Sequence, residues 1–499
     1  VNTMKKDRGN TKRRPRRENG RKQDSTGSWK NSKNRELVVV TYLFVALFVA
    51  LIGYFVYFEA VKSEVFINSS YNKRQDLFAK TVVRGEILDR NGEVLAKTVV
   101  GEDGTETRKY PYGKTFAHVV GYATNGKSGI ESYMNFRLLT SHAFILERLG
   151  NEFKGEKNTG DNVVTTLDLD LQQTAYDALG SHNGAVIVLE PSTGKILAMV
   201  SKPDYDPNTI AEKWDDITSP DNTESVLLNR ATQGLYPPGS TFKIFTTLEY
   251  IRENSDYTSY RFTCDGELKK EDTVIHCYNN DVHGEEDLLS SFSNSCNSSY
   301  ANLGLMLNPV KFTDTCDSLL FNQKLPYAYG YKQSSFSLEK DASTHDIMET
   351  AIGQGETLVT PLHMALVVSA IANDGVLMKP YLIDHTENYE GKTVKEYSPS
   401  EYGTLLKKEE AETMQNFMQT VVQEGTGRKL KGQSYTAAGK TGSAEYSDAD
   451  DSSHAWFVGY AHREDKTDIA LAVVVEGAGA GSTYAVPAAK QIFDAYYSR

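Results

Sequence analysis

The pattern of apolar and polar positions divides the chain into four parts. Residues 1–36 are polar, whereas residues 37–58 form an apolar run without a single charge. Short alternating pieces separated by Gly and Asn fill residues 59–165, and longer alternating and helix-periodic segments fill residues 166–499. We therefore expect a disordered tail, a helix that crosses a membrane at about 1.5 Å per residue, a smaller β-rich module and a main domain.

The boundary between the smaller module and the main domain lies where a strand pattern gives way to a helix pattern. In the smaller module, Asn91-Gly92 joins two alternating runs, which predicts a hairpin. At VVTTLDLDLQQTAYDALG a strand-like stretch gives way to an amphipathic helix that Asp168 or Asp170 could cap. The following segment, AVIVLEPSTGKILAMVS, predicts a second hairpin with a buried face.

The main domain has strands at both ends and helices between them. Helical periodicity appears in TFKIFTTLEYI and TPLHMALVVSAIAN. Near the end, TAAGKTGSAEY, HAWFVGYAHRED and DIALAVVVEG are strand candidates, and AVPAAKQIFDAYY closes the chain as a helix. This order predicts an α+β domain in which helices flank one antiparallel sheet.

Charge supports a membrane anchor with a defined orientation. Residues 1–36 carry 13 Lys and Arg against 4 Asp and Glu, while the other 41 Lys and Arg face 62 Asp and Glu. The basic segment has no interleaved aromatic residues and precedes an apolar run, so we expect a membrane flank and no nucleic-acid partner. Cationic flanks stay in the cytoplasm, which places the tail inside and everything after Phe58 outside.

One serine stands out as a candidate nucleophile. A lysine three residues after a serine lies one helical turn away and can take its proton. This spacing occurs at Ser70, Ser192, Ser240 and Ser337, but only Ser240 follows a Pro-Pro-Gly turn and opens an apolar-periodic helix, with Lys243 as the partner. The alternative interpretation of YPPGSTFK is a rigid turn followed by a helix-capping serine.

Two later segments favour the catalytic interpretation. SNSCNSSY offers the hydroxyl of Ser295 and the amide of Asn297. AAGKTGSAEY offers the cation of Lys440 and the hydroxyl of Thr441, beside a strand edge that Gly442 leaves open.

In this order, the three motifs resemble those of the penicillin-binding proteins, specifically the class B, monofunctional transpeptidases of the penicillin-binding protein A and 2 type. RGEILDRNG and GIESYMN resemble the amino-terminal module of that family, and IGQGETLVTPLHMA, EGTG and HAWFVGY resemble other family segments. The resemblance implies the penicillin-binding transpeptidase fold with a pedestal or dimerisation-like module. Only about 110 residues separate the apolar helix from the main domain, too few for a glycosyltransferase domain.

The resemblance also implies roles at the nucleophile. Ser240 would attack a D-Ala carbonyl of a stem peptide, with Lys243 as base and Lys440 helping to keep Lys243 neutral. Ser295 would pass the proton to the leaving D-Ala. The backbone N–H groups of Ser240 and Ser443 would form the oxyanion hole.

The remaining implied roles concern substrates and partners. Asn297 would hold the acylated peptide, and Lys440 with Thr441, beside Gly442, would receive the terminal carboxylate. The implied ligands are D-Ala-D-Ala stem peptides and β-lactam antibiotics, and the implied partners are a membrane glycosyltransferase and other cell-wall synthesis proteins.

Two other functions remain open at this point. The same acyl-enzyme could be hydrolysed, as in a carboxypeptidase or a β-lactamase, although no segment resembles the water-activating element of the latter. Alternatively, the chain could be a non-catalytic membrane-bound sensor or scaffold that binds β-lactams or wall peptides.

The cysteines and histidines give no metal or cofactor prediction. Cys264 and Cys277 flank a short polar excursion, and the sequence leaves open whether they are bridged or free. We expect Cys296 and Cys316 to be small buried residues. None of the ten histidines has metal-ligand spacing, so we expect no metal site and no cofactor.

Overall fold

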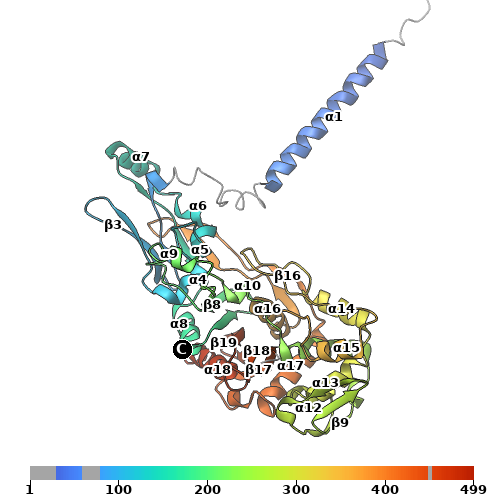
Figure 1. The fold of residues 1–499 in the computed structure, drawn as a ribbon. Coiled ribbons are helices and arrows are strands. Elements are labelled where there is room, and N and C mark those ends of the chain that lie inside the picture. Colours follow the sequence, from blue (N-terminus) through green and yellow to red (C-terminus); the bar gives the residue numbers. More distant parts are fainter. Residues whose placement is uncertain (1–29, 59–78, 448–451) are drawn as a thin grey trace, which may run out of the picture. The chain divides into compact units, whose positions relative to one another are not determined.

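The computed structural model describes residues 30–58, 79–447 and 452–499, which fall into two compact units, Val1–Ser69 and Ser70–Arg499 (Figure 1). In the first unit, α1 (Lys30–Tyr57) contains one stretch that is long and apolar enough to cross a membrane, Arg35–Tyr57. The helix begins at Lys30, so the prediction of disorder to residue 36 was wrong for its last residues. An apolar helix, once nucleated, propagates into neighbouring polar residues at little cost. Residues 1–29 of the expected tail lie outside the described residues.

The main domain of the second unit is built on a five-stranded sheet in the order β17-β18-β19-β7-β8, with every pair antiparallel. Its strands are β7 (Gly184–Leu189), β8 (Ile196–Lys202), β17 (Thr436–Ser447), β18 (Ser452–Arg463) and β19 (Lys466–Val475). The predicted hairpin of β7 and β8 and the three predicted strands near the end of the chain thus form one sheet. β17 lies at its edge.

Helices cover both faces of this sheet, which buries it at the centre of the main domain. α8 (Leu169–Ala178) and α18 (Ala485–Tyr497) pack on one face, and α16 (Pro361–Ala372) packs on the other. Successive side chains of β7 point to opposite faces of the sheet, so Val186 packs in the core cluster on one face and Ile187 in the core cluster on the other. The predicted α+β architecture is therefore confirmed.

The helical part between β8 and β17 contributes the other walls of the domain. Its principal helices are α11 (Lys243–Glu253), α12 (Leu288–Ser293), α13 (Asn297–Gly304), α14 (Pro309–Ser318), α15 (Thr344–Ala351) and α17 (Lys408–Gln423). Between α11 and α12, β9 (Phe262–Cys264) pairs with β12 (Gly284–Glu286), and the hairpin of β10 (Glu267–Lys270) and β11 (Thr273–His276) lies between these two strands in the chain. We call residues 262–286 the excursion.

The amino-terminal module is a second sheet, in the order β15-β14-β6-β2-β3-β4. The predicted hairpin at Asn91-Gly92 joins β2 and β3 of this sheet. After the module, Asp168 caps α8 as predicted, by accepting a hydrogen bond from Leu171 N at 2.9 Å. The strands are β2 (Ile87–Leu88), β3 (Val94–Val100), β4 (Glu106–Lys109), β6 (Asn162–Thr165), β14 (Ile383–Glu387) and β15 (Thr393–Glu396). β14 and β15 lie late in the chain, so this sheet extends beyond residues 59–165.

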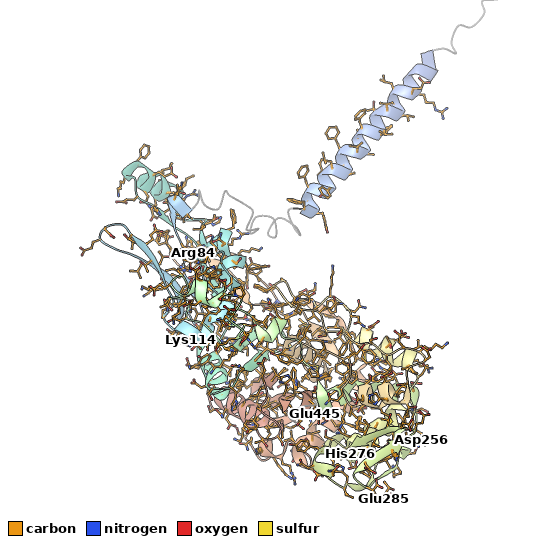
Figure 2. All side chains as sticks on the ribbon, viewed as in Figure 1. Arg84, Lys114, Asp256, His276, Glu285 and Glu445 are labelled. Carbon is orange, nitrogen blue, oxygen red and sulfur yellow. The ribbon has the colours of Figure 1, made fainter. Side chains whose placement is uncertain are left out.

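A buried ion cluster holds the amino-terminal module together. The Nε atoms of Arg84 and Arg108 each donate to a different carboxylate oxygen of Glu131 at 2.6 Å, and Arg84 also binds Asn135. Glu131 is fully buried, and Figure 2 shows Arg84 in this module. Burial acts to raise the pKa of Glu131, but the charges of Arg108 and Arg84 outweigh it and lower that pKa below its ordinary value. The two segments RGEILDRNG and GIESYMN are thus joined through their charged residues.

Replacing Glu131 with Ala should destabilise the chain strongly, because it leaves two buried guanidinium groups without their counter-charge. We expect the free energy of unfolding to fall by about 3–5 kcal/mol. Denaturant unfolding of the full chain in detergent measures the change. Asp465→Ala, which removes an exposed partner of Arg463, is the control and should leave stability unchanged. Equal effects of both substitutions would contradict the account.

Candidate active site

Ser240 lies in a tight turn that opens the first helix of the helical part. The turn is a 3-10 helix, Gly239–Phe242, and α11 continues directly from it. Gly239 has a φ of +51° and its N–H donates to Gly353 O at 2.9 Å, while Phe242 is fully buried against Phe245 and Phe336. The aromatic anchor fixes the turn and leaves Ser240 half-buried. Within the described part of the chain, the Ser240 hydroxyl has no hydrogen-bond partner, so it is available to a substrate.

Lys243 points into the interior at the start of α11. Its Nζ donates to Ser295 O and to Asn297 Oδ1, both at 2.7 Å, and lies 3.3 Å from Ser295 Oγ. The side chain is fully buried, and among the described residues no acidic group bonds to it. Burial lowers the pKa of Lys243 to about 8. A substantial fraction of this amine is therefore neutral near physiological pH.

Lys440 approaches the same hydroxyl from β17. Its Nζ donates to Ser295 Oγ at 2.8 Å and to Thr441 O at 3.1 Å. Burial, and then the charge of Lys243, lower the pKa of Lys440 well below its ordinary value. Two buried amines therefore converge on one hydroxyl, and their mutual repulsion disfavours both carrying a charge at once.

Ser295 is held at this junction by a strained turn. It lies between α12 and α13 with a φ of +59°, a conformation that costs a non-glycine residue free energy and is concentrated at functional sites. The N–H groups of Ser295 and Cys296 donate to Phe292 O and Ser291 O at 3.2 and 3.0 Å, which secures the turn. Asn297 begins α13, and its Nδ2 donates to His276 O at 3.0 Å.

The edge strand β17 passes close to the nucleophile turn. A Cβ added to Gly239 would lie 2.6 Å from Ser443 O, and one added to Gly442 would lie 3.1 Å from Pro238 O. Glycine at both positions therefore permits the two backbones to approach. The structure brings together the predicted residues Ser240, Lys243, Ser295, Asn297, Lys440, Thr441, Gly442 and Ser443.

Thr426 belongs to this site, although the sequence analysis did not single it out. Its Oγ1 lies 2.6 Å from Thr441 Oγ1, and its N–H donates to Ser293 O at 3.2 Å. A Cβ on Gly425 would lie 2.1 Å from Ser293 O, so glycine is required for this close approach. The segment EGTG resembles a family segment, and the two glycines that flank Thr426 are the sequence feature that indicates a constrained backbone there.

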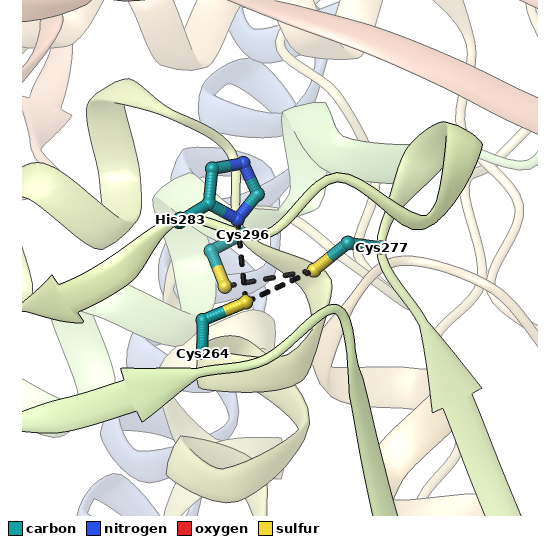
Figure 3. Close-up of side chains that lie close together, drawn as sticks. All are labelled: Cys264, Cys277, His283 and Cys296. Carbon is teal, nitrogen blue, oxygen red and sulfur yellow. Dashed lines mark hydrogen bonds between the residues drawn. The ribbon is translucent and has the colours of Figure 1, made fainter.

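The four cysteines are free thiols. The Sγ atoms of Cys264 and Cys277 are 3.7 Å apart, whereas a disulfide bond is about 2.05 Å long. Cys264 and Cys277 are therefore not joined by a disulfide bond. Cys296 and Cys316 are both buried as expected, and Cys296 also contacts Cys277, with 3.7 Å between the sulfur atoms (Figure 3).

With this geometry established, the comparisons with known proteins identify the class. The model of the penicillin binding protein transpeptidase domain matches residues 184–494, and that of the penicillin binding protein A dimerisation domain matches residues 84–163. The chain belongs to the penicillin-binding protein transpeptidase family.

Several relatives are more specific. The peptidoglycan D,D-transpeptidase PbpA of Mycolicibacterium smegmatis is 32% identical over 424 residues, which are 79% of this chain and 84% of the relative. The peptidoglycan D,D-transpeptidase MrdA of Acinetobacter baumannii is 29% identical, over 78% of this chain and 66% of the relative. The structure of penicillin-binding protein A from M. tuberculosis as a penicillin G acyl-enzyme complex superposes with a TM-score of 0.74 at 27% identity, covering 83% of this chain and 99% of that one.

Replacing Gly239 with Ala should displace the nucleophile turn, because the new Cβ meets backbone atoms that cannot move aside. Gly432→Ala is a matched control, since Gly432 also has a positive φ but an added Cβ would meet nothing within 4 Å. Both variants bear the left-handed cost of about 1–2 kcal/mol, and only Gly239→Ala adds the clash. We expect a larger fall in the thermal unfolding midpoint for Gly239→Ala, and equal falls would contradict this packing.

Proposed function

We propose that this chain is a membrane-anchored peptidoglycan D,D-transpeptidase that cross-links stem peptides through an acyl-enzyme on Ser240. The observation that carries the proposal is the convergence of Lys243 and Lys440 on Ser295, beside the half-buried Ser240. The names of the relatives, and the acyl-enzyme complexes formed by its structural neighbours, support the same reaction class.

The first half-reaction forms the acyl-enzyme. Neutral Lys243 takes the proton as Ser240 Oγ attacks the carbonyl of the penultimate D-Ala, and backbone N–H groups of Ser240 and Ser443 stabilise the oxyanion. The peptide bond to the terminal D-Ala then breaks, and Ser295, supplied through its contacts with the two lysines, passes a proton to the leaving amine. A β-lactam ring follows the same course, except that its leaving nitrogen stays attached to the acyl group.

The second half-reaction transfers the acyl group. The amine of a neighbouring stem peptide attacks the Ser240 ester, loses a proton through the same relay and restores the serine hydroxyl. This step forms the new peptide bond of the cross-link without a cofactor.

Substrate binding uses the groups around this relay. Asn297 donates to the peptide backbone, and Thr441 with Lys440 receives the carboxylate of the donor peptide. Thr426 supports this role, because its hydrogen bond to Thr441 orients that hydroxyl. Gly442 keeps the edge of β17 open for an extended peptide.

The catalytic domain works on the outer side of the membrane in this proposal. The basic residues before α1 favour a cytoplasmic amino terminus, which places residues after Phe58 outside, where stem peptides are found. The chain offers a transpeptidase domain, so a separate membrane glycosyltransferase is the natural supplier of glycan strands and a partner for the amino-terminal module, together with other cell-wall synthesis proteins.

A labelled penicillin should attach to Ser240 and remain there. We expect peptide mass spectrometry to find the label on this residue, and Ser240→Ala to abolish it. Ser337→Ala is the control, since Ser337 has the same lysine spacing but lies exposed and outside the site. Absence of label on Ser240 would contradict the proposal. Rapid release of the label would instead favour the hydrolase, and stable label without cross-linking of stem peptides would favour the sensor.

A further inference from the structure

One helix of the amino-terminal module, α7 (Ile145–Lys154), exposes its large apolar side chains. No residue of this fully described helix is buried, and Phe153 is 91% exposed. Figure 1 shows α7 at the end of the module that lies away from the main domain. Together with the residue before it, the helix carries five exposed large apolar residues: Phe144, Ile145, Leu146, Leu149 and Phe153. A contiguous exposed surface of this kind indicates a binding surface.

The polar side of α7 faces the module. Four apolar side chains share one side of the helix at about 100° per residue, and we call this side the apolar face: Ile145, Leu146, Leu149 and Phe153. Glu147 and Asn151 lie on the opposite side. The Tyr389 hydroxyl donates to Glu147 Oε2 at 2.7 Å, and Asn151 Nδ2 donates to Asn158 Oδ1 at 3.1 Å. These hydrogen bonds fix the rotation of the helix, so the apolar face points away from the module.

The connection from the membrane helix ends beside α7. Residues 58–78 lie between α1 and Ala79. The Nζ of Lys157, three residues after α7, donates to Ala79 O at 3.1 Å, and β1 (Val82–Val83) pairs with β5 (Asn158–Thr159). A chain that is anchored in a bilayer through this connection meets that bilayer at a high effective concentration, so even a short apolar face can bind it.

The side chains of α7 fit a lipid surface better than a protein partner. The apolar face has no hydrogen-bonding group, whereas protein interfaces carry about one hydrogen bond per 100–200 Å². Arg148 and Lys154 lie on either side of this face, where their long side chains can reach lipid headgroups. The two acidic residues of the helix, Glu147 and Glu152, balance these two cations, so its charge does not select anionic lipids.

We propose that the apolar face of α7 binds the surface of the lipid bilayer in which the chain is anchored. A helix of this kind lies parallel to the membrane, with its apolar side chains among the acyl chains and its flanking cations among the headgroups. A second membrane contact, besides α1, restricts the orientations that the catalytic domain can take at the bilayer. The inference rests on the membrane anchor of the proposed function and not on the chemistry at Ser240.

Photo-crosslinking of the full chain in phosphatidylcholine vesicles tests the contact. Phe153 is replaced with p-benzoyl-phenylalanine, which keeps an aromatic ring at a fully accessible position. We expect mass spectrometry to find lipid adducts at Phe153, and also when the probe stands at Leu47 in α1, but not when it stands at Val310. Val310 is the matched control because it is an exposed apolar residue in α14, which has the same length as α7. Addition of anionic phosphatidylglycerol should leave the yield at Phe153 unchanged.

A substitution in the apolar face gives a second test. Leu149→Asp should lower the lipid adduct at Phe153 several-fold, because a carboxylate on this face is disfavoured among acyl chains. Val310→Asp makes the same change on α14 and should leave the adduct unchanged. Both residues are exposed, so neither variant disturbs the core.

Lipid adducts at Leu47 without adducts at Phe153 would overturn the proposal and leave the membrane anchor standing. Equal lipid adducts at Phe153 and Val310, or adducts that join Phe153 to a second copy of the chain, would also overturn it. Adducts at neither Leu47 nor Phe153 would overturn the anchor as well. Penicillin labelling of Ser240 should be the same in every variant, so a failure of the transpeptidase chemistry is distinguishable from a failure of this contact.

Discussion

Two buried lysines that meet at one serine hydroxyl are the constraint on which the site depends. Lys243 and Lys440 reach Ser295 from different elements, and neither bonds to an acidic group in the described part of the chain. Burial lowers the pKa of both lysines and so populates the neutral amine, which is the form that a general base requires. The surrounding structure has to keep these polar groups satisfied and in place, because an unpaired buried amine would be costly.

The fold meets this requirement by bringing together segments far apart in the sequence. Lys440 lies on the edge strand of the sheet. Lys243 begins α11, directly after the buried Phe242 and one turn after Ser240. Ser295 lies in the turn between α12 and α13. Glycine at positions 239, 425 and 442 permits the close backbone contacts between these pieces. The strained turn at Ser295 is held from one side by α12, and the next residue, Cys296, contacts Cys277 of the excursion.

Local patterns predicted much of this arrangement. The hairpins of β2 with β3 and β7 with β8, the three strands near the end of the chain and the capped start of α8 all follow from alternation and turn chemistry over a few residues. The order of the three motifs selected Ser240 from four candidates with equal spacing. These features depend on neighbouring residues, so a single sequence contains their signal.

Long-range contacts were missed because no local pattern reports them. β14 joins the amino-terminal sheet from a distant part of the chain, and Arg84 meets Glu131 across 47 residues. Thr426 lies in a glycine-flanked loop whose contact with Thr441 exists only in the folded chain. Cys264, Cys277, His283 and Cys296 likewise come together only in the folded chain, because their spacing C-x12-C-x5-H-x12-C contains no closely paired members.

The central claim is that burial lowers the pKa of the active-site lysines, so that part of the Lys243 amine is neutral at physiological pH. NMR titration of the full chain with ¹³C- and ¹⁵N-labelled lysines measures this directly, with Lys243→Met and Lys440→Met assigning the two signals. The account predicts that Lys243 loses its proton near pH 8, and Lys440 well below the ordinary lysine pKa. Titration of both at the ordinary value, about 10.4, would contradict it.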